Sequence, residues 1–216
     1  MNKEYHQIKD RCRLGLIRYL DKAFSMIPEI PDPQILDIGC GTGVPTLWIA
    51  EKCEGLITAI DPDNEAIDWL RYKINDRNLS DRVTAMNISF SGFKASPGYF
   101  DIIIAEGFLN VVGFEFTFPF VVRILRKNGY LIIHDEFRDH DKKCDFIRSN
   151  DCRIVDTFFL DENVWWNDYY RQLESDIKAI ENDQLRELFS VDLEEIEYYR
   201  VNPDAFRSAY YVVEKL

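Results

Sequence analysis

The sequence predicts an α/β fold in which helices cover both faces of a mostly parallel sheet. Short, almost wholly apolar runs alternate with segments of helical period, which is typical of strands buried on both faces of a parallel sheet. A glycine-rich turn follows the first of these runs. The chain has 216 residues, of which 46% are hydrophobic, so it can bury the core that such a fold needs.

The first expected element is a helix over residues 4–26, where apolar residues recur at about the helical period and prolines follow. After it, we expect strand followed by helix five times over. A charged segment of helical period then separates a sixth strand from the last one. The expected strands are 35–38, 56–60, 83–88, 100–105, 130–134, 152–160 and 209–214, and the expected helices after the first are 45–53, 64–75, one reaching Leu125, 141–150 and 161–202.

The composition excludes several classes of protein. With 26 Lys and Arg against 38 Asp and Glu, the net charge is −12, which argues against a general nucleic-acid binder. There is neither an apolar stretch long enough to cross a membrane nor a secretion signal, so we expect a cytoplasmic protein. The five cysteines form no C-x-x-C pair and no metal-ligand spacing is visible, so we expect neither disulfides nor a bound metal. We also expect a single domain over 1–216.

The glycine-rich turn is the most informative segment. It places Asp37 two residues before Gly39-Cys40-Gly41, and Gly43 follows. Glycines let the backbone approach a ligand closely at the carboxyl end of a strand. The turn has Val44 where the dinucleotide fingerprint G-x-G-x-x-G has its third glycine, and it has no lysine of the kind found in nucleotide-hydrolase phosphate loops. Because Asp37 would repel a pyrophosphate, the pattern favours a cofactor that carries positive charge.

This D-x-G-x-G-x-G pattern resembles motif I of the class I S-adenosylmethionine (SAM)-dependent methyltransferases. The resemblance implies SAM as cofactor and S-adenosylhomocysteine (SAH) as product. It also implies a three-layer α-β-α sandwich with sheet order 3-2-1-4-5-7-6 and an antiparallel last strand. In that family an acidic residue at the end of the second strand holds both ribose hydroxyls; Asp61 matches it, with Pro62 beside it.

The same resemblance assigns the rest of the cofactor site. Ser89 and Phe90 match the positions that contact adenine, although the family often has Asp where Ser89 stands, which makes Asn87 a substitute candidate. Glu106 follows the fourth strand, where the family contacts the methionine part of the cofactor and the substrate. Asn110 is the nearby candidate for the substrate.

Four aromatic residues in the segment 161–202 share the spacing of one helix face and admit two interpretations. They form core or dimer packing, or they roof the substrate pocket as part of a cap made by 161–202 and the N-terminal helix. The surrounding segments resemble a subgroup of the family that acts on small molecules, so we expect a small-molecule methyl acceptor and no nucleic-acid or membrane partner. The four residues are Trp165, Trp166, Tyr169 and Tyr170.

A base is needed only if the acceptor must first lose a proton. His134 at the end of the fifth strand is the first candidate and Glu106 the second. Arg11 and Arg13 are candidates to pair with the carboxylate of the cofactor. Two alternatives stay open: an aminopropyl-type transferase on the same scaffold, and a non-catalytic SAM-binding partner protein. The accepting atom and the choice between monomer and homodimer are also open.

Overall fold

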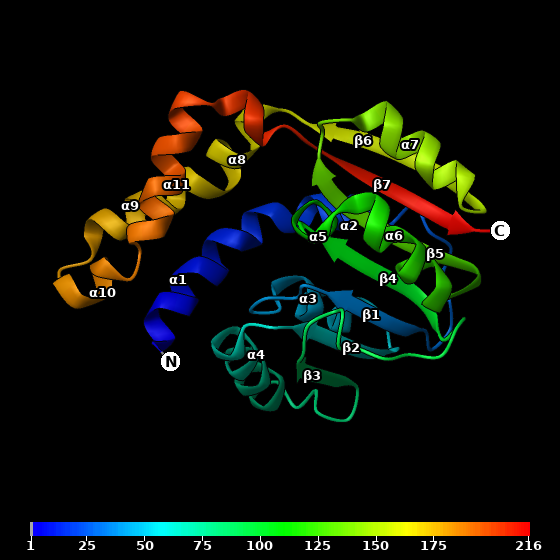
Figure 1. Cartoon of the computed structure of the whole chain (residues 1–216). Coiled ribbons are helices and arrows are strands. Elements are labelled where there is room, and N and C mark those ends of the chain that lie inside the picture. The colour runs from blue at the N-terminus through cyan, green and yellow to red at the C-terminus, as the bar shows by residue number, and fades with distance from the viewer. Residues whose placement is uncertain (1) are drawn as a thin grey trace.

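The computed structural model describes residues 2–216 and contains a seven-stranded sheet in the order β3-β2-β1-β4-β5-β7-β6. The last strand, β7, runs antiparallel to β5 and β6, whereas the other paired strands are parallel. The predicted order is therefore confirmed (Figure 1). The strands are β1 Gln34–Ile38, β2 Leu56–Asp61, β3 Val83–Asn87, β4 Phe100–Glu106, β5 Leu125–Glu136, β6 Cys152–Leu160 and β7 Ser208–Lys215.

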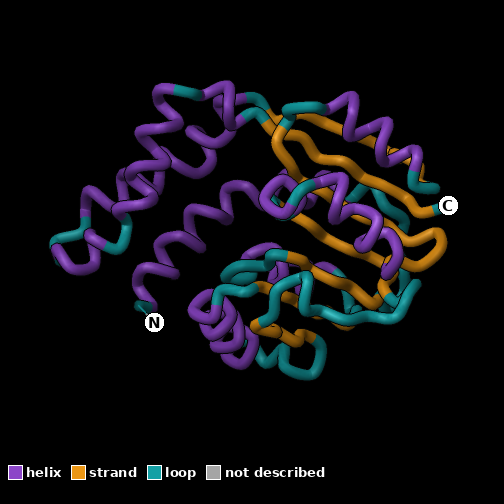
Figure 2. Tube along the Cα trace, viewed as in Figure 1, coloured by secondary structure: helices purple, strands orange, loops and turns teal. Residues whose placement is uncertain are grey.

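Helices cover both faces of the sheet, as Figure 2 shows. A central strand such as β4 is largely apolar because successive side chains enter opposite cores: Ile102 and Ile104 belong to one cluster, and Ile103 and Ala105 to the other. No helix within residues 2–216 is long and apolar enough to cross a membrane. The first face carries α2 Ile17–Phe24, α3 Val44–Lys52 and α4 Asn64–Asp76, and the second carries α5 Leu109–Val112, α6 Phe114–Ile124 and α7 His140–Ser149.

The N-terminal segment is not one helix, as predicted, but two. Helix α1 covers Lys3–Arg13, a 3₁₀ turn covers Leu14–Leu16, and α2 begins at Ile17. The break lies where the chain presses against another backbone, since a Cβ at Gly15 would be 2.1 Å from the carbonyl oxygen of Asp168. This contact lets α1 leave the sheet and lie against the helices near the C-terminus.

Those helices form a cap, which we define as residues 162–206. The cap has its own apolar core, in which Leu173, Phe189 and Ile196 pack with Ile8 and Cys12 of α1. The predicted helical insertion 161–202 is therefore present but divided into short helices (Figure 1). They are α8 Glu162–Trp165, a π-helical turn Trp166–Tyr170, α9 Arg171–Ala179, α10 Asp183–Glu187, α11 Ser190–Val201 and a 3₁₀ turn Pro203–Phe206.

The prediction that a helix follows each of the first five strands is wrong for β3. Residues 88–99 form a loop, which we call the 88–99 loop, and the chain then enters β4 directly. Its serines, glycines and Pro97 are turn-forming residues that do not sustain a helix. Apolar side chains of this loop, including Phe90 and Phe93, pack against the second face of the sheet in place of a helix.

Candidate functional site

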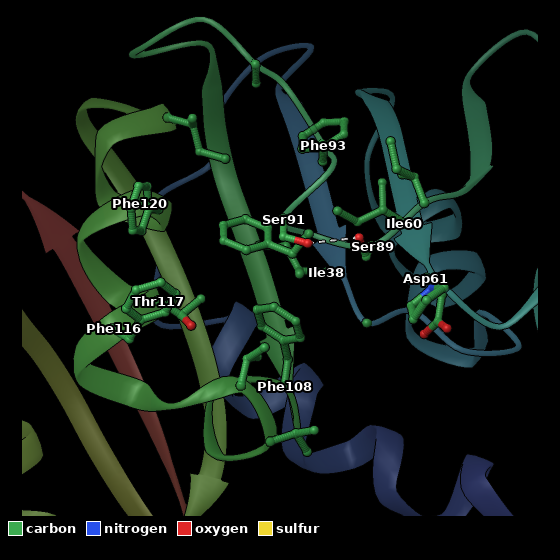
Figure 3. A pocket seen from close by; sticks show the side chains of 18 of the residues that line it. Ile38, Ile60, Asp61, Ser89, Ser91, Phe93, Phe108, Phe116, Thr117 and Phe120 are labelled. Carbon is green, nitrogen blue, oxygen red and sulfur yellow. Dashed lines mark hydrogen bonds between the residues drawn. The ribbon is translucent and has the colours of Figure 1, made fainter.

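Two cavities meet at the carboxyl ends of β1, β2 and β4. The larger, about 620 Å³, lies between the 88–99 loop and α6 and is lined mainly by apolar side chains (Figure 3). The smaller, about 240 Å³, is lined by α1, the glycine loop and Glu106. We call them the apolar groove and the polar cavity. Because Gly39 lines both, they form two ends of one cleft.

The glycine loop takes the backbone conformations that the sequence predicts for it. Gly39, Gly41 and Gly43 all have positive φ, at 71°, 52° and 80°. A Cβ on Gly43 would lie 2.3 Å from Cδ1 of Leu70, so only glycine lets α4 pack this closely. At Gly39 a Cβ would touch the ring of Phe108 at 3.4 Å, inside the cleft. Cys40, between them, is buried, and burial raises the pKa of its thiol.

Asp61 joins β2 to the glycine loop and faces the apolar groove. One carboxylate oxygen accepts from the N–H of Gly41 at 2.9 Å, and the other accepts from the N–H of Asp63 at 2.8 Å. Each oxygen retains a second lone pair, so the carboxylate can still accept from two hydroxyl groups. Pro62 also lines the groove.

Asp37 is the most deeply buried carboxylate of the polar cavity, with 2% of its surface exposed. Burial raises its pKa to about 7, opposed by the hydroxyl of Thr46, which donates to Asp37 at 2.5 Å; the neighbouring charges of Glu106 and Asp61 raise it further. A cation placed in this cavity would stabilise the ionised form of Asp37.

Glu106, His134 and Tyr210 lie side by side on β4, β5 and β7. The hydroxyl of Tyr210 donates to Glu106, and burial raises the pKa of the Glu106 carboxyl against the effect of this bond. The ring of His134 stacks on Tyr210, with centroids 4.4 Å apart and planes 3° from parallel.

The environment of His134 makes it a weak base. Burial lowers its pKa to about 3, and the positive charge of Arg13 acts in the same direction. Its Nε2 lies 2.9 Å from the hydroxyl of Ser208, and its ring is flanked by Tyr210 and by Trp165, whose centroid is 6.0 Å away. The histidine is therefore held as a neutral aromatic surface.

The side chains expected near adenine surround one end of the apolar groove. Ser89 and Phe90 both line it, and the Phe90 ring contacts that of Phe108 with centroids 5.4 Å apart. The hydroxyls of Ser89 and Ser91 lie 3.1 Å apart (Figure 3). Asn87, the substitute candidate, uses its amide N–H groups on the carbonyls of Asp61 and Pro62, so it shapes this edge of the cleft.

The four aromatic residues do not share one role. Tyr169 lines the polar cavity, and Trp165 stacks on His134. Trp166 instead stacks on Tyr199 within the cap, and Tyr170 is buried in the cap core. The π-helical turn over Trp166–Tyr170 accounts for this division, because it changes the angle between successive side chains from that of an α-helix. Asn110, the other substrate candidate, is exposed on α5 and lines neither cavity.

Helix α1 supplies side chains that the sequence pattern did not single out. Asp10 accepts from Thr42 of the glycine loop at 2.5 Å, from Trp69 at 2.8 Å and from Lys73 at 2.5 Å, so it ties α1 across the cleft. No local pattern marks such a residue, since its partners come from distant segments.

The two arginine candidates at the end of α1 behave differently. Arg13 lines the polar cavity, and within residues 2–216 it has no ion pair. Arg11 points away from the cavity to the cap and pairs with Asp176 at 2.8 Å. The expectation for Arg11 is therefore wrong, whereas Arg13 remains available for a carboxylate.

Comparison with known protein families supports the interpretation of this cleft. Residues 35–129 match a family model described as "Methyltransferase domain". This range runs from β1 into β5 and includes the glycine loop, Asp61 and Glu106.

Named relatives share part of the chain. The ribosomal protein L11 methyltransferase of Ruminiclostridium cellulolyticum is 30% identical over 107 residues, which cover 50% of this chain and 31% of that protein. Methyltransferase GfsG of Streptomyces halstedii is 25% identical over 119 residues, covering 55% of this chain and 43% of that protein. The chain thus spans less than half the length of either relative.

Solved structures resemble nearly the whole chain. The [4+2]-cyclase SpnF has a TM-score of 0.78 at 17% identity, covering 92% of this chain and 80% of that one. A SAM-dependent methyltransferase from Geobacter sulfurreducens, solved with SAH, has a TM-score of 0.69 at 15% identity, covering 92% and 90%. At these identities the likeness shows the fold alone.

Proposed function

Because the chain belongs to the class I SAM-dependent methyltransferases, a family of enzymes that use SAM as cofactor, we propose that it transfers a methyl group from SAM to a small-molecule acceptor. The observation that carries the proposal is the glycine loop bound to Asp61 through the N–H of Gly41, at the edge shared by two cavities. The fold alone would not suffice, since one structural neighbour carries the name of a cyclase.

The cleft fits this cofactor by its own chemistry. Asp37 and Glu106 form an acidic environment for a sulfonium and an ammonium group, and Asp61 has lone pairs left for the ribose hydroxyls. Arg13 lines the polar cavity and has no ion pair within residues 2–216, so it suits the cofactor's carboxylate. The proposed cofactor-binding residues are Asp37, Gly39, Cys40, Gly41, Gly43, Asp61, Pro62, Ser89, Phe90 and Glu106.

When bound, SAM supplies a methyl group that is already activated by a positive sulfonium. The protein therefore has to align the acceptor with that methyl and exclude water. Tyr169 lines the polar cavity together with Glu106 and would contact the acceptor. The ring of Trp165 lies 6.1 Å from that of Tyr169 and stacks on His134, so it supports this side of the cavity. Glu106 would take the proton of an O–H or N–H acceptor, because it lines the polar cavity and burial raises the pKa of its carboxyl, which makes the carboxylate a stronger base.

Two observations favour a small acceptor over a macromolecule, although some relatives are named for ribosomal protein and tRNA substrates. The polar cavity is only about 240 Å³ and is covered by α1. The net charge of −12 opposes a polynucleotide, whose phosphates need clustered Lys and Arg.

The first test is calorimetric binding of SAM and SAH to the purified chain, with NADH and decarboxylated SAM as control ligands. We expect SAH to bind and Asp61→Ala to weaken binding by about 100-fold, because a charge-assisted contact and the anchor of the glycine loop are both lost. Asp68→Ala, on the exposed side of α4, is the matched control and should bind SAH normally.

The outcomes separate the alternatives. SAH binding followed by SAH release in an acceptor screen supports methyl transfer. Tighter binding of decarboxylated SAM would favour an aminopropyl transferase, and tight binding with no release for any acceptor would favour a non-catalytic partner. A folded protein that binds neither SAM nor SAH would refute the proposal.

A further inference from the structure

The apolar groove is longer than a cofactor's adenine ring requires. One end is lined by Gly107 and Phe108, which follow β4, and the other by Phe93 and Ile124. The Phe93 ring lies 6.3 Å from Phe100, the first residue of β4. The seven residues of β4 extend about 20 Å at the usual rise of a strand, so the groove follows much of that length, as Figure 3 shows between Phe108 and Phe93.

The walls of the groove are aromatic and partly open to solvent. On α6, Phe116 and Phe120 are 73% and 50% exposed, and their ring centroids are 5.8 Å apart. The facing wall is the 88–99 loop with Phe93, which stands where the other parallel strands are followed by helices. A loop covers less of a sheet than a helix does, which leaves apolar surface that a ligand can bury.

The far end of the groove is basic in an otherwise acidic protein. Arg123 lines the groove there, and Lys94 lies between two residues that line it, Phe93 and Ala95. Both cations are exposed, and neither forms an ion pair within the described residues 2–216. Asp61, the acidic residue of the groove, is at the opposite, cofactor end. An anionic group is therefore favoured next to Arg123.

We propose that the apolar groove, beyond its adenine end, binds an elongated apolar carboxylate such as a long-chain fatty acid. The chain lies between Phe93 and Phe120, and the carboxylate pairs with Arg123. Phe93, Phe120 and Arg123 line only the apolar groove, whereas the reacting methyl is expected in the polar cavity, so this ligand is distinct from the methyl acceptor. The site is thus additional to the proposed methyl transfer.

The test is a fluorescence titration of the whole chain with cis-parinaric acid, with and without saturating SAH. We expect saturable binding of one molecule per chain, retained when SAH is bound. Phe120→Asp should weaken binding by at least about tenfold, because it places a charge in the apolar wall. Arg123→Ser should weaken it by about three- to fivefold, and the methyl ester of the probe should bind with the weakened affinity and be insensitive to Arg123→Ser.

Matched controls come from exposed residues elsewhere. Phe159→Asp changes a phenylalanine of β6 that is 55% exposed, and Arg171→Ser removes an exposed arginine of the cap; neither should affect the titration. Phe120→Leu keeps the wall apolar and should bind nearly as the parent chain does. Thermal unfolding of each variant checks that the protein is folded.

Three results would overturn the proposal. They are the absence of saturable binding, complete displacement of the probe by SAH, and equal weakening by the control and groove variants. Displacement would mean that the groove holds adenine and nothing further. Since the titration without SAH does not depend on cofactor binding, failure of the methyltransferase proposal and failure of this one are distinguishable.

Discussion

The two ends of the cleft recognise ligands by opposite means. The polar cavity is lined by Asp37, Glu106 and, from α1, Arg13, so charge is decisive there. The apolar groove has phenylalanines on both walls. The difference has a structural origin, since helix α1 borders the first end and the 88–99 loop borders the second. Binding of charge therefore depends on α1, and binding of apolar groups depends on the 88–99 loop.

The largest expected effect is at the glycine loop, whose residue Gly39 joins the two ends. In Gly43→Ala the new Cβ meets Leu70 at 2.3 Å on a backbone with φ of 80°, so we expect a loss of about 2–3 kcal/mol in the free energy of unfolding. Gly41→Ala is the control: its Cβ has no neighbour within 4 Å, and only the left-handed backbone costs about 1 kcal/mol. Urea unfolding measures both, and equal losses would show that the contact with Leu70 is not limiting.

At the polar end, Glu106→Gln should lower kcat by about 100-fold, because it removes the proposed proton acceptor. Tyr210→Phe removes a donor that favours the ionised carboxylate, so the pKa of Glu106 rises and the acid limb of the kcat profile moves to higher pH. His134→Gln should cost about tenfold or less, as expected for a weak base. If His134→Gln were the more damaging change, histidine would regain the role of base.

The raised pKa of Asp37 predicts that SAM affinity changes with pH, whereas ligand affinity in the apolar groove should not. A cation prefers the ionised carboxylate, whose pKa is about 7, so SAM affinity should increase about tenfold between pH 6 and 8 and then level off. The Asp37→Asn variant should bind SAM more weakly, and its affinity should not change with pH. Binding of parinaric acid should be the same in this variant as in the parent chain. Calorimetry over this pH range, with Asp68→Asn as the control, measures it.

The same pKa has a consequence for stability with the opposite sign. Between about pH 4 and 7 the folded chain retains a proton on Asp37 that the unfolded chain has released. As the pH rises through this range, Asp37 therefore makes the free energy of unfolding fall. In Asp37→Asn that contribution should disappear. A steeper decline in the variant than in the parent chain would contradict the assignment.

The smallest expected effect distinguishes two neighbouring tryptophans. Trp165→Ala should raise the acceptor KM about fivefold with SAH affinity unchanged, because Trp165 covers the His134 ring beside Glu106. Trp166→Ala should leave KM unchanged and lower the melting temperature, because Trp166 stacks on Tyr199 inside the cap. Steady-state kinetics and thermal unfolding of both variants test this difference. A higher acceptor KM in Trp166→Ala, with KM unchanged in Trp165→Ala, would contradict it.

Several features were predictable because they depend on neighbouring residues. Apolar runs mark the buried strands, and their alternation with helices indicates a parallel sheet. The positive φ values of Gly39 and Gly43 follow from a tight turn between β1 and α3. Asp37 and Asp61 stand at the ends of adjacent parallel strands, so the topology alone brings them to the same edge of the sheet.

The sequence by itself therefore determined the parallel character of the sheet, the glycine loop and the acidic residues beside it, because period and turn chemistry are local properties, whereas the sheet order came from the family resemblance. Only the tertiary structure decided that Arg13 and not Arg11 faces the cleft, and that Trp165 and not Trp166 stacks on His134. The direction of a side chain depends on helix breaks, on a π turn and on distant backbone contacts such as Gly15 with Asp168. Spacing along the chain does not encode these contacts, because their partners meet only when the cap and α1 pack together.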